Sequence, residues 1–521
     1  MAEKFRVTYA TMSADNEELQ SKYDEAAERM KGELGKEYPF VVNGEERWTD
    51  EKYEEPSPID SDIIIGRFSQ ATPKDVDDAV AAAKGFQLEW DRMGWQARVE
   101  IMRNVADIME DRLFDLAALM AYEVGKSRLE ALGDVQETAE LIRWNADEMD
   151  KHEGFRTPMS GMGAAGDYYD VLRPYGVWAV ISPFNFPMAL SGGPSSGALV
   201  AGNAVVLKPS NQGALMGYKL YECYRDGGVP AGAFHLVTGR GAYAGDHLWK
   251  HPDVGGITFT GSYPVGMDIY KHFANEVPKP VICEMGGKNP AIVTKSADLD
   301  KATDGVLRSA FGFGGQKCSA CSRVFVEREV YDDFLGLLKQ KTEKIKVGNP
   351  IQRDVYLGPI INEPAMETFE EAADEARKNG TIVTGGNRLT DGDFARGLFV
   401  EPTIVEVPAD NWIWKRELFV PFVAVAPFDE LDDAIEKAND TEYGLTAGFF
   451  SEDTTEVKEW LDRIQAGVVY VNRRAGATTG AWPGVQPFGG WKGSGTTGKA
   501  GGGPYYVTLY LREQSRTVIS E

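Results

Sequence analysis

Cysteine and histidine are both scarce in this chain of 521 residues, which contains four cysteines and five histidines. Four cysteines in this length are too few for the disulfide framework of a secreted protein and are typical of a reducing compartment, so we expect free thiols. The histidines show no metal-ligand spacing, and we expect no metal site. The segment from Met1 to Arg6 lacks the cationic and long apolar regions of a signal peptide. The expected location is cytoplasmic.

Long hydrophobic runs and an excess of basic residues are also missing. No stretch approaches the roughly twenty apolar residues of a membrane span. Lys and Arg number 55 against 80 Asp and Glu, a formal net charge of −25, which opposes binding to nucleic acid or anionic membranes. No repeat of fixed period is visible, which excludes solenoids and propellers. What remains is a large globular chain, 43% apolar, with room for about two to four domains.

The first 150 residues are predicted to be mainly helical, with one hairpin. Residues 14–35 are charged and helix-prone, and residues 38–48 form a predicted hairpin that turns at Asn43-Gly44. Thr72 and Pro73 are a suitable cap and first residue for a helix from Lys74. Helical periodicity then persists, with breaks, to about Asp150, so several helices precede the main sheet.

Short apolar runs alternate with helical patterns in two later series, which predicts βαβ units and an α/β fold with parallel sheets. The runs are 177–181, 204–207, 235–237 and 257–260, then 290–293, 323–327, 381–384, 422–425 and 468–471. Paired glycines in Glu284-Met285-Gly286-Gly287-Lys288 favour a domain boundary there. Residues 167–173 and 505–512 are alternating and aromatic outside both series, and we expect them to form a small added sheet, an oligomerisation flap.

Cys318 stands on the glycine-rich turn Gly314-Gly315-Gln316-Lys317-Cys318-Ser319 and is the candidate nucleophile. A free thiol is mostly protonated at neutral pH, but backbone amide dipoles and the nearby Lys317 would favour the thiolate. A structural cysteine in a turn explains these residues about equally well. A cysteine peptidase also stays open, because a histidine partner need be adjacent only in space. Cys321 lies three residues later, but no second cysteine pair suggests zinc.

A cofactor signal comes from Gly261, Ser262 and Gly266, which form a turn between a predicted strand and a predicted helix. Exposed amides at such a turn can bind pyrophosphate. The spacing lacks the GxGxxG fingerprint, so an ordinary strand-to-helix turn is the alternative. An earlier predicted strand ends at Lys208, where open α/β sheets bind ligands. Lys208 can hold a ribose or phosphate there, or be a solvated lysine at a strand end.

Six motifs together resemble the aldehyde dehydrogenase superfamily and occur in that family's order, from about Pro39 to the C-terminus. They are Pro183-Phe184-Asn185-Phe186, Lys208-Pro209-Ser210, Phe259-Thr260-Gly261-Ser262, Glu284-Met285-Gly286-Gly287-Lys288, Gly315-Gln316-Lys317-Cys318 and Glu417-Leu418-Phe419. The resemblance implies a Rossmann-like dinucleotide-binding domain (1–160 with 176–285), an α/β catalytic domain (286–480) and an oligomerisation flap (161–175 with 496–521).

The resemblance also implies the chemistry of the site. Cys318 matches the nucleophile and Glu284 the general base that activates water. The Asn185 side-chain amide and the Cys318 backbone amide match oxyanion donors, worth roughly 3 to 4 kcal/mol each. Residues matching the NAD site are Phe184, Lys208, Ser210, Gly261, Ser262, Gly266, Glu417 and Phe419.

Two residues depart from the family pattern. Asn211 stands where many NAD-selective relatives have a glutamate that repels a 2′-phosphate, so NADP can be tolerated. Val420 replaces the usual glycine, so the mobility of the nicotinamide loop can differ.

The glutamate-semialdehyde branch of the family is indicated by the run from Gln316 to Arg323, by Gln486-Pro487-Phe488-Gly489-Gly490 and by Lys499-Ala500-Gly501-Gly502. That likeness implies oxidation of L-glutamate 5-semialdehyde to glutamate in proline catabolism by a homo-oligomer. The substrate carboxylate would bind Ser319, Gly480 and Ala481, and the aliphatic stem would lie between Phe186 and Phe488. The stretch 473–479 is longer than in relatives. The alternatives are another short acidic semialdehyde, or a noncatalytic binding or structural oligomer, which would be free to lose the three catalytic residues.

Overall fold

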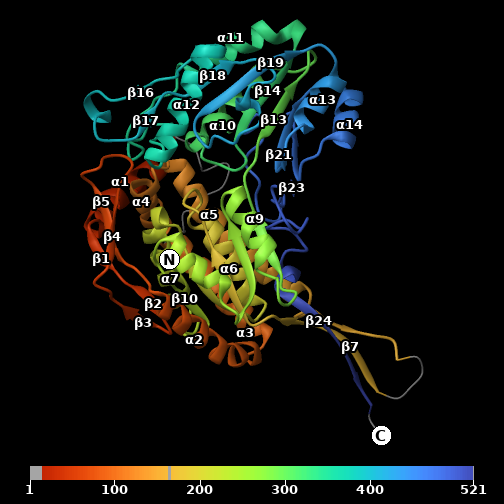
Figure 1. The fold of residues 1–521 in the computed structure, drawn as a ribbon. Coiled ribbons are helices and arrows are strands. Elements are labelled where there is room, and N and C mark those ends of the chain that lie inside the picture. Colours follow the sequence, from red (N-terminus) through yellow and green to blue (C-terminus); the bar gives the residue numbers. More distant parts are fainter. Residues whose placement is uncertain (1–14, 162–165, 520–521) are drawn as a thin grey trace.

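The computed structural model describes residues 15–161 and 166–519, and these form two large sheets stacked as two halves of the molecule (Figure 1). Residues 1–14, 162–165 and 520–521 lie outside the described part, and with them the expectations for the chain start, for segment 162–165 of the flap and for the last two residues. The α/β class expected from the two series of apolar runs is confirmed.

Helices dominate the N-terminal region as predicted. They are α1 (Glu17–Met30), α2 (Pro73–Arg92), α3 (Trp95–Asp111), α4 (Leu113–Val124) and α5 (Arg128–Lys151), with short strands β1 (Lys36–Tyr38), β4 (Lys52–Pro56) and β5 (Ile64–Ser69) between them. The start of α2 shows why the sequence signal was sound. Thr72 accepts a hydrogen bond from the Asp75 amide, Asp75 bonds back to the Thr72 amide, and Pro73 needs no donor at the first position.

The first seven-stranded sheet has the order β12-β11-β8-β9-β10-β2-β3. Four of its parallel strands come from the first apolar series: β8 (Val177–Ile181), β9 (Ala204–Lys208), β10 (Phe234–Leu236) and β11 (Val254–Thr260). The fifth parallel strand, β12 (Val281–Glu284), was not among the predicted runs. The predicted Asn43-Gly44 hairpin, β2 (Phe40–Val42) and β3 (Glu45–Arg47), extends one edge in antiparallel fashion. Helices α6 (Ala189–Val200), α7 (Ala214–Asp226), α8 (Asp246–Lys250) and α9 (Tyr263–His272) connect the parallel strands.

The second seven-stranded sheet has the order β15-β18-β19-β14-β13-β21-β22. Its strands are β13 (Asn289–Val293), β14 (Cys321–Glu327), β15 (Thr381–Thr384), β18 (Thr403–Glu406), β19 (Phe422–Phe428), β21 (Thr446–Phe450) and β22 (Val468–Val471). Its helices are α10 (Leu299–Phe311), α11 (Tyr331–Thr342), α12 (Glu363–Asn379), α13 (Leu431–Asn439) and α14 (Thr454–Arg463). Short pairs β16 (Arg388–Leu389) with β17 (Phe399–Val400), and β20 (Tyr443–Gly444) with β23 (Trp491–Lys492), lie at its margins.

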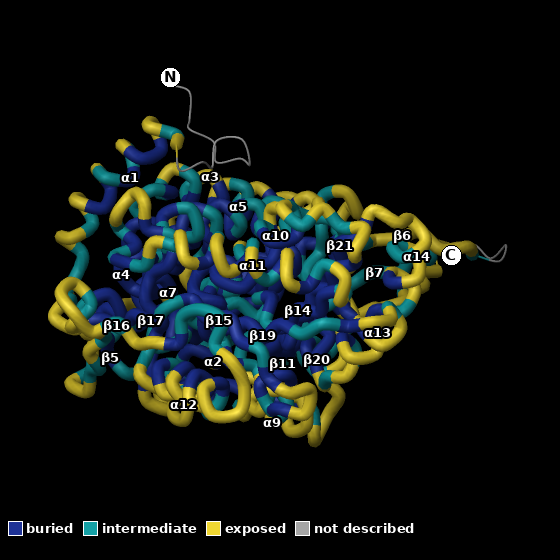
Figure 2. Tube along the Cα trace, turned by 90° about the horizontal axis from the view of Figure 1, so that it is seen from above, coloured by how far each residue is buried: buried dark blue, intermediate teal, exposed yellow. Residues whose placement is uncertain are grey.

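Both sheets are buried on two faces, which explains why their strands are continuous apolar runs. In β8, Trp178 and Val180 enter one core, whereas Val177 and Ala179 enter the core on the opposite face. The second sheet is divided in the same way between two further cores. Figure 2 shows this buried interior enclosed by exposed helices and loops.

The predicted small added sheet exists, but its C-terminal strand lies later than expected. It consists of β6 (Arg156–Pro158), β7 (Asp167–Pro174) and β24 (Leu511–Val518), paired antiparallel in the order β24-β7-β6, and it extends away from the body in Figure 1. The expected strand at 505–512 was wrong over most of its length. Residues 507–510 form a short 3-10 helix, and Tyr506 and Tyr510 are buried in the main core instead.

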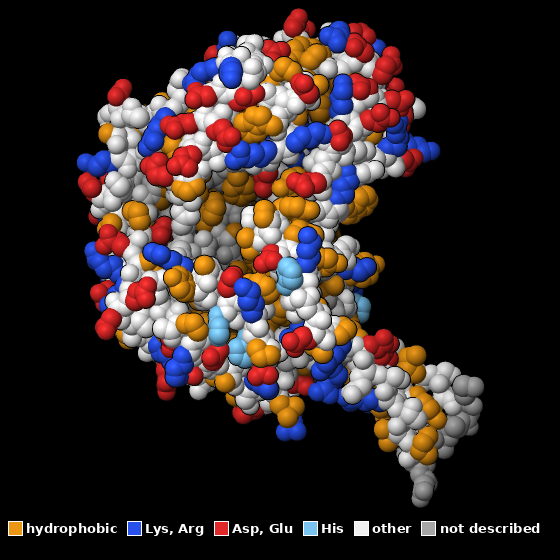
Figure 3. All heavy atoms as spheres, viewed as in Figure 1, with side chains coloured by type: hydrophobic (Ala, Val, Ile, Leu, Met, Phe, Trp, Pro, Cys, Tyr) orange, Lys and Arg blue, Asp and Glu red, His pale blue; other side chains and the backbone are white. Residues whose placement is uncertain are grey.

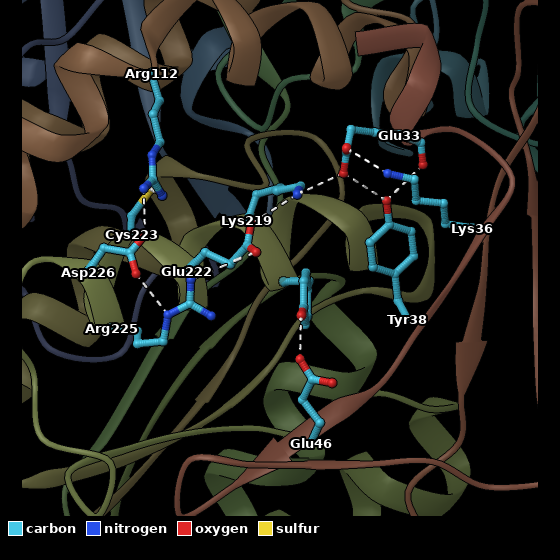
Figure 4. A network of polar contacts seen from close by, with 11 residues as sticks. Glu33, Lys36, Tyr38, Glu46, Arg112, Lys219, Glu222, Cys223, Arg225 and Asp226 are labelled. Carbon is cyan, nitrogen blue, oxygen red and sulfur yellow. Dashed lines mark hydrogen bonds and ion pairs between the residues drawn. The ribbon is translucent and has the colours of Figure 1, made fainter.

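Ion pairs tie the N-terminal region to the first sheet's helices (Figure 4). Lys219 on α7 lies between Glu33, at 3.1 Å, and Glu222, at 2.9 Å, while Tyr38 donates to the Glu33 carbonyl. Such partly exposed pairs contribute little individually. Within residues 15–161 and 166–519, no helix is long and apolar enough to cross a membrane, and no three His, Cys, Asp or Glu side chains are grouped to hold a metal ion.

Candidate active site

Cys318 lies where the chain crosses from α10 into β14, between the two sheets. The turn before it requires glycine: Gly314 and Gly315 have φ of 63° and 66°, and a Cβ on Gly315 would lie 2.9 Å from the Val420 carbonyl carbon. The Asn289 side-chain amide donates to the carbonyls of Cys318 at 2.7 Å and Ala320 at 2.9 Å, which fixes the turn. Cys318 is half-buried and unpaired, as expected for a free thiol.

The glycine turn after β12 packs directly against this cysteine. A Cβ on Gly287 would overlap the Cys318 carbonyl oxygen and would lie 2.7 Å from Asn289 Oδ1. Two motifs separated by about thirty residues therefore meet through their backbones, and Glu284 and Cys318 are close enough for their charges to interact. Figure 3 shows the surface hollowed between the two halves of the molecule that carry these motifs.

Burial raises the pKa of the Cys318 thiol, and the carboxylates of Glu417 and Glu284 raise it further. The backbone amides of Ser319 and Cys318 act in the opposite direction, as expected from the turn. The expected help from Lys317 was wrong. The Lys317 ammonium turns away to Glu130 on α5, with nitrogen–oxygen distances of 2.6 and 2.7 Å, so its charge is already paired.

Glu284 is the last residue of β12 and precedes the glycine turn. Its carbonyl accepts from the Gly261 amide at 3.1 Å, while its Oε2 atom is buried without a hydrogen-bond partner. Burial raises the pKa of Glu284 well above its usual range, and the Gly490 amide opposes that shift. A carboxylate of raised pKa beside a thiol is suited to accept a proton from water.

Asn185 is buried in the loop between β8 and α6, with Phe184 and Phe186 on either side. The Phe186 ring lies 3.6 Å from the Lys126 ammonium and 5.9 Å from that of Lys317, which brings the loop to the cysteine turn. The Phe184 ring meets Phe419 edge to face at 6.0 Å. The loop thus joins the cysteine side and the Glu417 side of the site.

Glu417 projects onto the same glycine turn. Its Oε1 accepts from the Gly287 amide at 2.8 Å, and a Cβ on Gly286 would lie 2.6 Å from its carboxyl carbon. Burial raises the pKa of Glu417 to about 7. Phe419 adopts φ of 59°, the left-handed conformation, and is held there by the packed loop.

The remaining cofactor candidates lie at the carboxyl edge of the first sheet. Lys208 is buried, donates one hydrogen bond to the Pro209 carbonyl at 2.9 Å, and has a pKa lowered to about 8 by burial. Ser210 accepts from the Gln212 amide at 3.3 Å. Ser262 caps α9 without using its side chain there, and Gly261 and Gly266 leave no room for a Cβ beside Phe259 and Met285.

These residues fit a nicotinamide dinucleotide. A buried ammonium with unused hydrogens suits ribose hydroxyls, an open helix N-terminus suits pyrophosphate, and a buried carboxylate over a bare glycine suits a second ribose.

The predicted anchor for a substrate carboxylate is a compact loop. Thr478 donates to the Ser319 carbonyl at 2.6 Å, so Ser319 and the loop before Gly480 are neighbours. Arg473 donates to the carbonyls of Thr479 and of Gly480, the latter at 3.1 Å, and Gly480 has φ of 97°. Ala481 is partly exposed beside it. Phe488 is held in place by reciprocal backbone bonds with Gly501, at 2.9 and 2.8 Å.

Sequence reasoning missed a buried charged cluster behind Phe186. Lys126 and Asp134 form a fully buried pair at 2.8 Å, next to the Glu130–Lys317 pair. Glu137, one turn after Asp134 on α5, has a pKa raised to about 8 by burial and by Asp134. The four-residue spacing of Glu130 and Asp134 was the available signal, but their lysine partners are visible only in the fold.

Comparisons with known proteins agree with this geometry. The model of the aldehyde dehydrogenase family matches residues 46–515. A 1-pyrroline-5-carboxylate dehydrogenase from a Geobacillus species is 38% identical over 502 residues, covering 95% of each chain. The crystal structure of a 1-pyrroline-5-carboxylate dehydrogenase from Thermus with bound NAD is 32% identical, with a TM-score of 0.92 and 99% of each chain covered.

A larger protein, proline utilization A from Bdellovibrio bacteriovorus, is 35% identical with a TM-score of 0.90, and this chain covers 51% of its length. The match extends over 95% of the present chain, so the likeness includes both sheets and the site between them. The chain belongs to the aldehyde dehydrogenase family.

Proposed function

We propose that this protein oxidises L-glutamate 5-semialdehyde, the open form of 1-pyrroline-5-carboxylate, to L-glutamate with NAD as the hydride acceptor. The observation that carries the proposal is the packing of Gly287, in the turn after Glu284, against the Cys318 carbonyl, which supports Cys318 and Glu284 as nucleophile and base of one site. The names of the relatives support the substrate and the cofactor.

In the first step the Cys318 thiolate attacks the aldehyde carbon, a sulfur–carbon bond forms, and the carbonyl electron pair moves onto oxygen. The Asn185 side-chain amide and the Cys318 backbone amide stabilise that oxyanion. Bound NAD supplies a hydride acceptor, so that the carbon attached to Cys318 becomes a thioester. Glu284 then takes a proton from a water that attacks the thioester, the carbon–sulfur bond breaks, and the thiolate and a carboxylate product are released.

Glu417, with Phe419, Phe184, Lys208, Ser210, Gly261, Ser262 and Gly266, would hold the cofactor, and the first sheet with residues 176–285 would be its binding domain. Asn211 follows Ser210 and carries no charge to repel a 2′-phosphate, which supports NADP as a second possible acceptor.

The anchor loop supports a substrate that carries a carboxylate. Ser319 and the amides near Gly480 and Ala481 would bind that group, while Phe186 and Phe488 would enclose the stem. An aliphatic aldehyde would leave these donors without a partner, which is the basis of discrimination. We also infer a homo-oligomer, supported by the extended β24-β7-β6 sheet, and a cytoplasmic location, supported by cysteine usage.

Absorbance of reduced nicotinamide tests the proposal, with glutamate 5-semialdehyde, succinate semialdehyde and a simple aliphatic aldehyde compared in NAD and in NADP. The expected result is a kcat/KM for glutamate 5-semialdehyde at least about 100-fold above that for the aliphatic aldehyde. Equal rates for all three aldehydes would contradict the substrate, and no reduction with any pair would contradict the reaction.

A further inference from the structure

Four buried groups below Glu284 form a continuous chain of hydrogen bonds. Trp178 Nε1 donates to Thr258 Oγ1 at 3.0 Å, Thr258 Oγ1 donates to Tyr510 Oη at 3.4 Å, and Tyr510 Oη donates to Tyr506 Oη at 2.7 Å. All four residues are at most 6% exposed. Polar groups buried in this way persist only when their bonding is satisfied, so the order of donors along the chain matters.

The first bond of the chain has a fixed direction, because an indole N–H can only donate. Thr258 accepts that bond and donates its own hydroxyl hydrogen to Tyr510, and Tyr510 donates its hydroxyl hydrogen to Tyr506. The hydroxyl hydrogen of Tyr506 is therefore the one that the chain does not use. This hydrogen is held ready for an acceptor outside the chain.

The register of β11 and β12 places the Glu284 side chain on the tyrosine side of the sheet. Thr258 pairs with Ile282, and Thr260 pairs with Glu284. Ile282 and Glu284 are two residues apart and so share a face, and Ile282 belongs to the core that contains Trp178, Tyr506 and Tyr510. Glu284 lies on the strand next to Thr258 and two residues further along, so their backbones are roughly 8 Å apart.

Glu284 presents the missing acceptor, since its Oε2 is buried and has no hydrogen-bond partner. Burial raises the pKa of both Tyr506 and Tyr510, and the Glu284 charge raises both further, so the two hydroxyls lie within the field of Glu284. We propose that Tyr506 is a positioning residue for the base, whose hydroxyl hydrogen binds a water shared with the Glu284 carboxylate. The inference rests on the proposed function, because it assumes that Glu284 is the base.

The effect on catalysis follows from the charges around Glu284. The titratable neighbours of Glu284 are Cys318 on the cleft side, Cys283 on the strand side, and Tyr506 and Tyr510 on the core side. The Gly490 amide is a donor, and among the described residues no Lys, Arg or His is paired with Glu284. Burial therefore favours the protonated acid, and a donor directed at the carboxylate favours the ionised base. Without the Tyr506 hydroxyl, the apparent pKa of the hydrolytic step should rise.

The test is Tyr506→Phe in the full-length enzyme, with Tyr224→Phe as the matched control. Tyr224 is also buried, but its hydroxyl donates to the Gly192 carbonyl at 2.8 Å and has no part in the chain from Trp178 to Tyr506. Rapid mixing with NAD and glutamate 5-semialdehyde would follow the first turnover of reduced nicotinamide, and quenched samples would follow thioester hydrolysis, from pH 6 to 9.

Tyr506→Phe should shift the pH profile of hydrolysis upward by about one unit, which slows hydrolysis about tenfold on the acidic side, and leave first-turnover hydride transfer unchanged. An unshifted profile, or equal losses in both steps, would overturn the inference. If Tyr506→Phe does not fold, Tyr510→Phe should give a smaller shift in the same direction, and no shift would overturn the inference. Failure of wild type to reduce NAD with any aldehyde would instead overturn the proposed function.

Discussion

Gly286→Ala is a perturbation that should separate cofactor binding from folding. A Cβ at this position would lie 2.6 Å from Glu417 Cδ and 2.7 Å from Glu417 Oε1, closer than real Cβ contacts allow. The obstructing atoms are the end of a flexible side chain, so Glu417 can rotate away at little cost in stability. That rotation breaks its 2.8 Å bond with the Gly287 amide and removes the carboxylate from the proposed ribose site.

The size of the effect follows from the bonds that Glu417 would lose. A hydrogen bond to a charged group contributes about 1.5 to 3 kcal/mol, and 1.4 kcal/mol is tenfold in affinity. The expected result is a Kd for NAD about 10- to 150-fold higher by titration calorimetry, with a Tm within about 2 °C of wild type.

Two other glycines serve as controls for this result. Gly336→Ala, at an exposed position of α11 with no atom within 4 Å of the new Cβ, should leave the Kd for NAD unchanged and should not lower Tm. Gly287→Ala should lower Tm, because its Cβ overlaps the backbone oxygen of Cys318, which cannot rotate away. A Gly286→Ala protein that binds NAD as tightly as wild type would refute the role given to Glu417.

Iodoacetamide should alkylate Cys318 in preference to the three buried cysteines, as measured by peptide mapping. The alkylation rate should rise nearly tenfold per pH unit from pH 6 to 9, because burial raises the pKa of the Cys318 thiol and only the thiolate reacts. A plateau of the rate near neutral pH would contradict this prediction. The affinity for NAD should increase about tenfold from pH 6 to pH 8. The Glu417 pKa of about 7 leaves this carboxyl group mostly protonated at pH 6 and mostly ionised at pH 8. Glu417→Gln should abolish this pH dependence. Lys126→Met should lower the free energy of unfolding, measured with denaturant, by about 3 to 5 kcal/mol, because it leaves the Asp134 charge buried without an ion-pair partner. Adding Asp134→Asn should restore part of that loss. A double variant with no recovery would argue against a coupled pair.

The sheets could be predicted from the sequence because buried strands are local apolar runs. Residues 177–181 coincide with β8, and the Asn43-Gly44 turn gave the β2–β3 hairpin at the expected place. β12, β18 and β21 were missed, because such short runs resemble loop segments when their neighbours in the sheet are unknown. At Tyr506 and Tyr510 an aromatic alternation suggested a strand, yet a four-residue spacing on a helical turn buries both rings just as well.

In the site, too, some contacts follow from residues that are close in sequence, whereas others depend on residues that only the fold brings together. The cysteine turn and the glycine turn after Glu284 are marked by glycines whose positions a Cβ would obstruct, so the motifs themselves carry the geometry. Lys317 shows the limit of such reasoning. It is adjacent to Cys318 in sequence, but it pairs with Glu130, 187 residues earlier, and only the packing of α5 against the turn reveals that partner.

The central claim is that Cys318 carries the acyl group that Glu284 helps to hydrolyse. The direct measurement is intact-protein and peptide mass spectrometry of Glu284→Gln after mixing with NAD and glutamate 5-semialdehyde. We expect one glutamyl group attached at Cys318 with about one equivalent of reduced nicotinamide, and neither in the Cys318→Ala, Glu284→Gln double variant. An adduct on another cysteine, or full turnover by the double variant, would contradict it.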